Sequence, residues 1–315
     1  MERNALLDYL KLILSFSVIA IHLEGFLSEV PTLGWLISNG IARIAVPCFF
    51  IINGYYISSV IENKNNLKKY CIRYCIIYIV WMMIYAPFHQ NIIGAIHFPT
   101  AIRQTITWLL GWGHLWYVSA MIGGVLFLYI LKAFIKKTNI LLILALLLFL
   151  IGYIIQRLYL FDINIPTSTL CRNFLFIGFP FIFIGYYIRK KHFIDKALVN
   201  KRTVFYILIL FAILLVESFF TYKMQRNSDF YIVLPILCPL LILFIMKTNT
   251  ICKLQAHTFI SNLSGCIYFI HLLVMYSVIS IFNFAPTKQF ILILFFSMLI
   301  STGIIKLNQK IRLFL

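Results

Sequence analysis

Charged residues are scarce in this 315-residue sequence, where they make up 11% of the chain while hydrophobic residues make up 62%. A soluble globular protein has about a quarter charged residues and close to half apolar ones. The composition therefore excludes a soluble protein and indicates a polytopic membrane protein. No polar stretch is long enough for a separate soluble domain, so we expect a single transmembrane domain over residues 1–315.

Acidic residues are scarcer still, with nine Asp and Glu against 27 Lys and Arg, for a net charge of +18. In a soluble protein this excess would suggest binding to nucleic acid. In a membrane protein it is typical of cytoplasmic loops, which are rich in Lys and Arg. We therefore expect membrane lipid as a partner and no nucleic acid.

Cysteine pairs are also missing, because the seven cysteines form no CxxC motif and nearly all lie in or beside apolar runs. We interpret them as small side chains buried in the membrane, and we predict no metal site. The first apolar segment carries Asp8 and Lys11 and is followed by no small-residue cleavage site. We therefore do not expect it to be a cleavable signal.

Long apolar runs predict an all-α, polytopic integral membrane helix bundle with about ten transmembrane helices. A β-barrel would instead show alternating strands of about ten residues. The stretch from Ile92 to Leu110 is only moderately apolar, and we expect it to be one short re-entrant or interfacial segment. The predicted spans are Leu6–Phe26, Leu33–Ile61, Tyr70–Phe88, Leu115–Phe134, Ile140–Ile155, Phe174–Ile188, Val204–Phe220, Tyr231–Met246, Ile267–Phe284 and Phe290–Lys306.

The basic residues predict the orientation of these helices. Most of them fall at the chain ends and in alternate connections, above all in Lys64–Arg73 and Arg189–Arg202. Since cytoplasmic loops carry the excess of Lys and Arg, we expect both termini in the cytoplasm. The two basic connections are topology determinants that would also attract a polyphosphate ligand.

The first apolar segment carries a polar stripe formed by Asp8, Lys11, Ser15 and His22. On an α-helix, Lys11 and His22 lie within roughly 20° of each other, about three turns apart. Asp8 and Ser15 fall within about 60° of the same line. A single polar stripe on an apolar helix faces protein or a water-filled cavity rather than lipid.

His22 is a candidate general base, since neutral imidazole can take a proton from a hydroxyl near neutral pH. A histidine that is hydrogen-bonded between helices is the structural alternative. Asp8 and Lys11 form either part of the site or a pair that anchors the helix at the interface. Arg43 lies too deep to reach water, so it pairs with an acid such as Asp8 or Glu217 or holds an anionic ligand.

Other candidates lie further along the chain. Asn53 and Gly54 interrupt the second span and provide donors and close backbone approach, or a tight helix-packing site. His114 lies among tryptophans, including Trp116, that could simply anchor the chain at the membrane interface. Arg172 and His271 are ionisable residues within or near spans, which makes each a candidate for a functional role.

The order of these motifs resembles the membrane acyltransferase 3 family, whose best-described members O-acetylate bacterial surface polysaccharides. The resemblance covers nearly the whole chain. The family opens with an acid, a base three residues on and a histidine eleven residues later, and it continues with a Pro-x-Phe-Phe run, a basic loop before an aromatic span, a His-Leu-Trp element, an Arg-Asn-Phe entry and a late Ser…Tyr-x-x-His. Here these are Asp8, Lys11 and His22; Pro47 to Phe50 with Asn53 to Tyr55; Lys69 and Arg73 before Trp81; His114 to Trp116; Arg172 to Phe174; and Ser264, Tyr268 and His271.

The resemblance implies transfer of an acetyl group from cytoplasmic acetyl-CoA, a co-substrate, to a hydroxyl of a cell-surface glycan or its lipid-linked precursor in the bacterial cytoplasmic (inner) membrane. The implied catalytic residues are His22, as general base or as a transiently acetylated residue, and Asp8. Two positions depart from the family pattern, since Lys11 stands where many members have Arg and Asn53 where Ser is usual. Lysine still neutralises a phosphate, but it cannot form the bidentate arginine fork. The implied donor-binding residues are Lys11, Arg43, Asn53, Lys69 and Arg73, and the acceptor-side residues are His114, Trp116, Arg172 and His271.

Two other functions stay open from the sequence. A transporter or flippase for a glycolipid or small anion would use the same charged interior, although we find no internal repeat of the kind such proteins often show. A glycan polymerase or ligase would need a large external loop with several arginines, and every predicted external connection is short.

Overall fold

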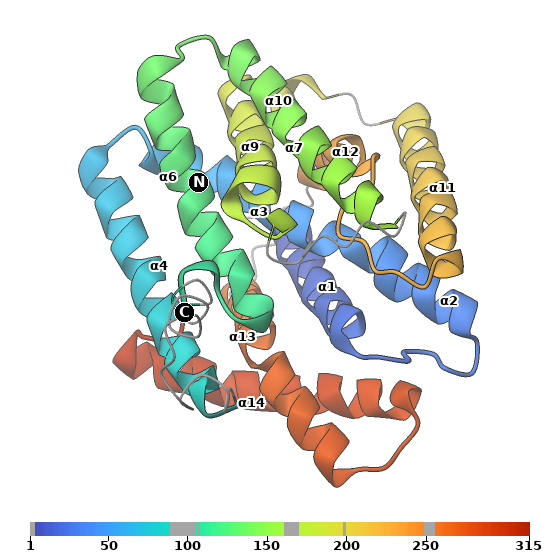
Figure 1. Ribbon diagram of the computed structural model, residues 1–315. Helices are drawn as coiled ribbons and strands as arrows, with labels where there is room; N and C mark the ends of the chain where they lie inside the picture. The colour runs from blue at the N-terminus through green and yellow to red at the C-terminus, as the bar shows by residue number, and fades with distance from the viewer. Residues whose placement is uncertain (1–3, 89–104, 106–107, 161–169, 198–199, 249–255) are drawn as a thin grey trace. The chain divides into compact units, whose positions relative to one another are not determined.

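The computed structural model describes residues 4–88, 105, 108–160, 170–197, 200–248 and 256–315. Within those residues every regular element is helical (Figure 1). The α-helices are α1 (Ala5–His22), α2 (Pro31–Trp35), α3 (Ala45–Val60), α4 (Lys64–Tyr85), α6 (Trp116–Phe134), α7 (Thr138–Leu160), α9 (Phe179–Lys190), α10 (Phe193–Lys196), α11 (Lys201–Lys223), α12 (Leu234–Lys247), α13 (Ala256–Ile281) and α14 (Pro286–Ile311).

Eight helical stretches in the described part of the chain are long and apolar enough to cross a membrane. A ninth apolar helix, α12, has 14 residues, and the π-turn η6 (Phe174–Gly178) continues into α9. The polytopic, all-helical fold is therefore confirmed, while the number of ten spans and the cytoplasmic termini stay predictions. The predicted segment Ile92–Leu110 lies largely outside the described residues.

Asparagines placed before apolar runs fix where several helices begin. The Asn4 side chain accepts a hydrogen bond from the Leu7 backbone at the start of α1. Asn63 does the same for the first turn of α4. These side chains satisfy backbone N–H groups that a helix start otherwise leaves open. Because of the Asn63 cap, α4 begins at Lys64, so the predicted basic loop is wrong from that residue onward.

The second predicted span is one continuous helical stretch with an irregular middle. Between α2 and α3 the chain forms a short π-helix, η1 (Leu36–Gly40), and a short 3-10 helix, η2 (Ile41–Ile44). The predicted interruption at Asn53 and Gly54 is wrong, because α3 passes through both residues unbroken. Short π segments inside helices often mark functional sites, so the irregular turns draw attention to the residues beside them.

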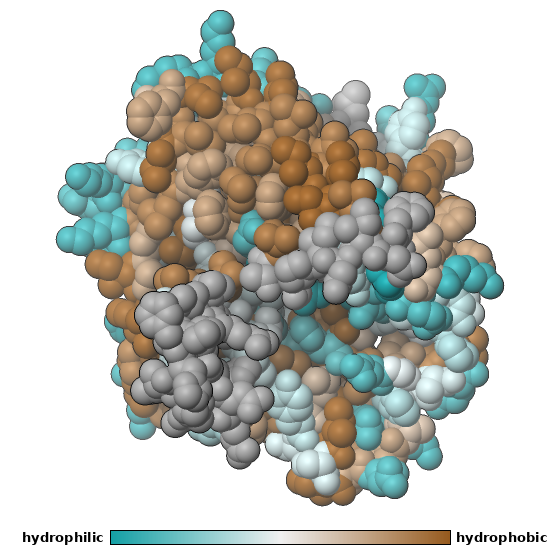
Figure 2. Space-filling view, viewed as in Figure 1, coloured by the Kyte–Doolittle hydropathy of each residue, from teal (hydrophilic) through white to brown (hydrophobic). Residues whose placement is uncertain are grey.

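The chain forms two compact units. The first contains Met1–Ile52 and Ile188–Leu313, and in it α1 packs against α13, which in turn packs against α14. The second contains Asn53–Tyr187, where η6 lies against α6 and α7. Apolar side chains cover much of the visible surface in Figure 2. Such surfaces are expected for helices that contact lipid rather than water.

Candidate active site

The polar stripe of α1 faces α13 in the first unit. Lys11 forms an ion pair with Asp8 at 3.0 Å, and its ammonium lies 3.4 Å from the hydroxyl of Ser261. The Ser264 hydroxyl donates to the Lys11 backbone carbonyl at 2.8 Å. Asp8 is 2% exposed. A buried carboxylate needs such a cationic partner, and the pair with its serine neighbour forms one polar end of the helix interface.

The other end of the stripe brings two histidines together. The ring of His22 lies 5.3 Å from the ring of His271, measured between centroids, with the planes tilted by 42°. Since Lys11 meets the first part of α13 and His22 meets a later part, α1 and α13 run parallel. Eleven residues of α-helix place the Lys11 end about 16 Å from the His22 end along this interface.

The proton position on His271 follows from its backbone contact. Nδ1 of His271 lies 2.7 Å from the carbonyl oxygen of Tyr268, one turn earlier on α13. A carbonyl only accepts, so Nδ1 is the donor. In the neutral ring the proton then sits on Nδ1, which makes Nε2 the basic nitrogen. His271 is fully buried, whereas His22 is partly exposed.

Arg43 is held by residues that the sequence did not single out. Its guanidinium forms an ion pair with Asp229, from the connection between α11 and α12, and also donates to the side chain of Asn39. The Tyr231 hydroxyl donates to the Asn39 backbone carbonyl. An acid pairs with Arg43, as one of our two alternatives held, and that acid is Asp229, which we did not name as an example. Asp229 is one of several polar residues in its connection, and no sequence signal links it to Arg43.

Asn53 and Gly54 have structural contacts in the second unit. The Asn53 side chain both donates to and accepts from the Tyr70 hydroxyl, at 2.8 and 3.1 Å. A Cβ on Gly54 would lie only 1.9 Å from the backbone carbonyl oxygen of Ile182 in α9. This close approach supports the helix-packing alternative for Gly54.

The remaining predicted residues also belong to the second unit. Lys69 and Arg73 are exposed, one turn apart on α4. His114 is buried, 2% exposed, with its ring 5.0 Å from that of Tyr85. Trp116 begins α6, and the partly buried Arg172 lies two residues before η6.

The structure thus joins some of the predicted site residues directly. Within the first unit, Asp8 contacts Lys11 on α1. His22 of α1 contacts His271 of α13. Arg43 has its own cluster in that unit. Sequence reasoning missed Ser261, although its spacing of three residues from Ser264 places both serines on one helix face.

Comparison with known proteins gives one family and several distant relatives. A family model described as an acyltransferase domain matches residues 4–306. An amino-acid racemase of Enterococcus faecalis is 26% identical over 97% of this chain and 46% of its own length. A serine/alanine racemase of Enterococcus gallinarum is 25% identical over 74% of this chain and 36% of its own length. The chain spans less than half the length of these relatives, and no solved structure matches.

Proposed function

The chain belongs to the membrane acyltransferase family whose model covers it almost from end to end, and from that membership we propose that it transfers an acetyl group from cytoplasmic acetyl-CoA to a hydroxyl of a cell-surface glycan or its lipid-linked precursor. The observation that carries the proposal is the polar line between α1 and α13. A cation lies at one end, and two histidines lie about 16 Å away at the other. An extended pantetheine arm matches such a separation of phosphates from thioester.

In the proposed reaction His22 is the general base. It takes the proton of the acceptor hydroxyl as the oxygen attacks the thioester carbonyl. The new ester C–O bond forms, the C–S bond breaks, and CoA leaves as the thiol with the proton that His22 received. Transient acetylation of His22 is the other route that this geometry supports.

The donor would bind with its phosphates at the Lys11 end. Asp8 holds the Lys11 ammonium in place, and that ammonium supplies a point charge to a phosphate. In the second unit, Lys69 and Arg73 are exposed cations on α4 that would attract a polyanion. Arg43 would have to exchange Asp229 for a phosphate, and Asn53 would have to leave Tyr70, so both are weaker candidates for the donor site.

His271 would complete the acceptor side of the reaction centre, beside His22. We propose His114, Trp116 and Arg172 as further acceptor contacts. The protein would work as a multi-pass protein of the bacterial cytoplasmic membrane, with both termini inside.

The names of the relatives support a second candidate. They are amino-acid racemases, and this chain aligns with less than half of each. As the second candidate we propose that this chain transports a small charged solute such as an amino acid, without any reaction. A transporter of this kind would neither bind acetyl-CoA nor hydrolyse it.

The test is the His22→Ala variant in membranes supplied with labelled acetyl-CoA. Loss of a general base typically costs about 10²- to 10⁴-fold in rate. We expect label transfer to fall by that order, while His192→Ala, at an exposed histidine on the connection before α10, keeps the wild-type rate. Transfer at the wild-type rate by His22→Ala would exclude the catalytic role. Absence of both binding and slow hydrolysis of acetyl-CoA by the purified wild-type protein would favour transport.

A further inference from the structure

Two serines one turn apart on α13 contact Lys11 in different ways. The Ser264 hydroxyl donates to the backbone carbonyl of Lys11 at 2.8 Å, which fixes the level at which α1 and α13 pack. The Ser261 hydroxyl oxygen lies 3.4 Å from the Lys11 ammonium itself. Ser264 therefore belongs to the helix contact, whereas Ser261 lies beside the charge to which the proposed function assigns the donor phosphates.

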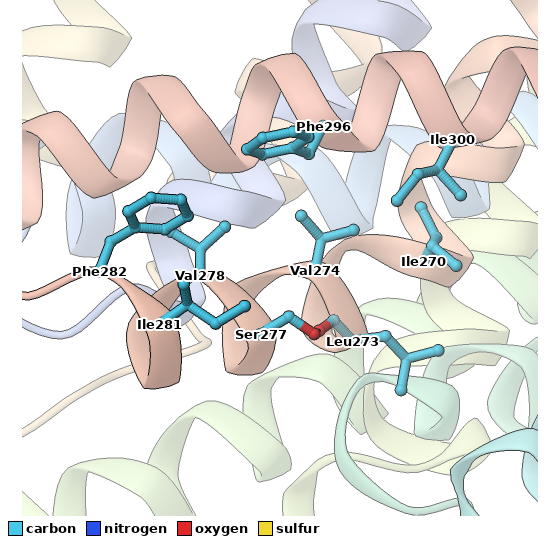
Figure 3. A pocket seen from close by; sticks show the side chains of 9 residues that line it. All are labelled: Ile270, Leu273, Val274, Ser277, Val278, Ile281, Phe282, Phe296 and Ile300. Carbon is cyan, nitrogen blue, oxygen red and sulfur yellow. The ribbon is translucent and has the colours of Figure 1, made fainter.

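The direction of the hydrogen bond between Lys11 and Ser261 determines what the serine can still do. An ammonium only donates, so the Ser261 oxygen accepts and its own hydrogen points elsewhere. In the part of the chain that the structure describes, no other group accepts that hydrogen. Ser277 of the same helix differs. It lines the apolar groove between α13 and α14 (Figure 3), and it donates to the Leu273 carbonyl of its own helix at 3.0 Å. The Ser261 O–H can therefore donate to a ligand that reaches Lys11.

Both the ammonium and the hydroxyl are accessible to a ligand. The side chain of Lys11 is 19% exposed, and Ser261 is also partly exposed. Their acidic neighbour Asp8 is buried, with its side chain 2% exposed. An anion that approaches from the exposed side therefore meets a positive charge and a hydroxyl donor together.

We propose that Ser261 is a phosphate-binding residue of the donor site, and that Lys11 and Ser261 form a two-point contact with one phosphate group of acetyl-CoA. This inference rests on the proposed function. The ammonium supplies the charge, and the serine O–H donates to a second oxygen of the same phosphate. A lysine alone acts as a point charge, whereas an arginine offers two donors in a fixed fork. Ser261 gives this lysine site the second, directional donor that a guanidinium would provide.

The hydroxyl contact is stronger than a hydrogen bond between neutral groups. A hydrogen bond to an ionised oxygen is about twice as strong as a neutral one. Donation from the ammonium to the Ser261 oxygen also polarises the O–H, which strengthens its own donation. Loss of one such bond lowers affinity roughly 10-fold. Because the Lys11 end lies about 16 Å from the histidines, the loss should fall on donor binding rather than on the chemical step.

The experiment compares acetyl-CoA with S-acetylpantetheine, which carries the thioester arm without the phosphates. Thiol release and acetyl transfer are measured on the purified full chain. Ser261→Ala should raise the KM for acetyl-CoA roughly 10-fold at unchanged kcat. It should leave kcat/KM for S-acetylpantetheine within about twofold of the wild type, because that donor has no phosphate to lose. Ser261→Thr, which keeps the hydroxyl, should retain the wild-type KM for acetyl-CoA.

The Lys11→Arg background tests the two-point contact directly. There the guanidinium supplies the second donor, so Ser261→Ala should raise the KM for acetyl-CoA by less than about threefold. A double-mutant cycle over the two positions measures this coupling. If the wild type turns over acetyl-CoA but not the truncated donor, this comparison decides in its place, and a full 10-fold effect in the Lys11→Arg background would overturn the two-point contact.

Two serine-to-alanine changes on the same helix serve as controls. Ser277→Ala removes a hydroxyl that bonds to its own helix, and it should leave both donors unaffected. Ser264→Ala loosens the helix contact, and it should affect both donors alike. An equal effect of Ser261→Ala on the two donors, or no effect on acetyl-CoA, would overturn the phosphate role and leave acetyl transfer standing. Failure of the wild type to use acetyl-CoA would overturn the proposed function, and this inference with it.

Discussion

Lys11 shows how a single charge in a membrane-spanning helix is stabilised and how it can serve a ligand. Its ammonium contacts a buried carboxylate and a serine hydroxyl. The carboxylate is Asp8 of the same polar stripe on α1, and the hydroxyl is Ser261 of α13, the helix that the stripe faces. The ion pair keeps Asp8 satisfied when no ligand is bound, and a phosphate at Lys11 adds a second anion to the same cation.

Lys11→Met should therefore weaken donor binding more than it slows the chemical step. A hydrogen bond to a charged group contributes about 1.5–3 kcal/mol, so the KM for the acyl-CoA donor should rise roughly 10- to 100-fold. Steady-state kinetics on purified protein measure this. Lys11→Arg, which keeps the charge, should retain most of the affinity. A fall in kcat at constant KM would place Lys11 in the reaction itself.

At this scale the sequence predicted one part of the site well. The spacing of Asp8, Lys11 and His22 follows directly from the helical repeat, so their shared face was predictable. The partners were not, because Ser261, His271 and Asp229 lie more than 180 positions away along the chain. A single sequence carries no signal that selects one distant acid over another for Arg43.

At the scale of elements, close helix contacts depend on residues without side chains. Gly54 lets the middle of α3 approach the backbone of α9. At Gly303, on α14, no atom outside its own turns of the helix backbone lies within 4 Å of the place where a Cβ would stand. The two glycines therefore offer a matched comparison within one protein.

Gly54→Ala should destabilise the protein by about 1–3 kcal/mol, the usual cost of overpacking a filled interior. Gly303→Ala should stabilise it by about 0.5–1 kcal/mol, since alanine favours the helix. Thermal unfolding of both variants in detergent, followed by loss of helical signal, gives the two shifts. Equal shifts of one sign would show that the α3–α9 contact is not as close as the structure has it.

The helical elements were largely predictable from hydropathy, but their irregular parts were not. Apolar runs located every long helix. The capping asparagine Asn63, however, makes α4 begin at Lys64, before the predicted start at Tyr70. The turns η1 and η2 contain Ser38, Asn39, Gly40 and Arg43 within an otherwise apolar run, and hydropathy alone does not predict which helical geometry they adopt. Their geometry depends on packing and on the Arg43 cluster, which are properties of the folded chain rather than of local sequence.

For the whole molecule, the charge distribution predicts an orientation that the helices alone do not provide. The exposed lysines Lys136 and Lys137 lie between α6 and α7, and Lys190 lies at the end of α9. Cytoplasmic connections carry such residues. The helical membrane architecture predicted from the sequence is confirmed, its direction stays a prediction, and the structure adds which helices pack together in each unit.

A fluorescent protein fused after Leu315 should fluoresce in cells, and alkaline phosphatase fused at the same place should be inactive, because the predicted C-terminus is cytoplasmic. Whole-cell fluorescence and phosphatase assays measure the two signals. Phosphatase fused after Ser28, in the exposed connection that follows α1, should be active and serves as the control. The reverse pattern at the C-terminus would invert the proposed direction of the donor path.

The ion pair between Arg43 and Asp229 also sets an order of events during synthesis. The two residues are 186 positions apart. At about 5–20 residues per second, Arg43 is added to the chain roughly 10 to 40 s before Asp229 is. During that time the guanidinium has to remain near water or lipid headgroups, because burial without its acid is costly. The turns η1 and η2 therefore reach their final place only after α11 has been made, late in the assembly of the first unit.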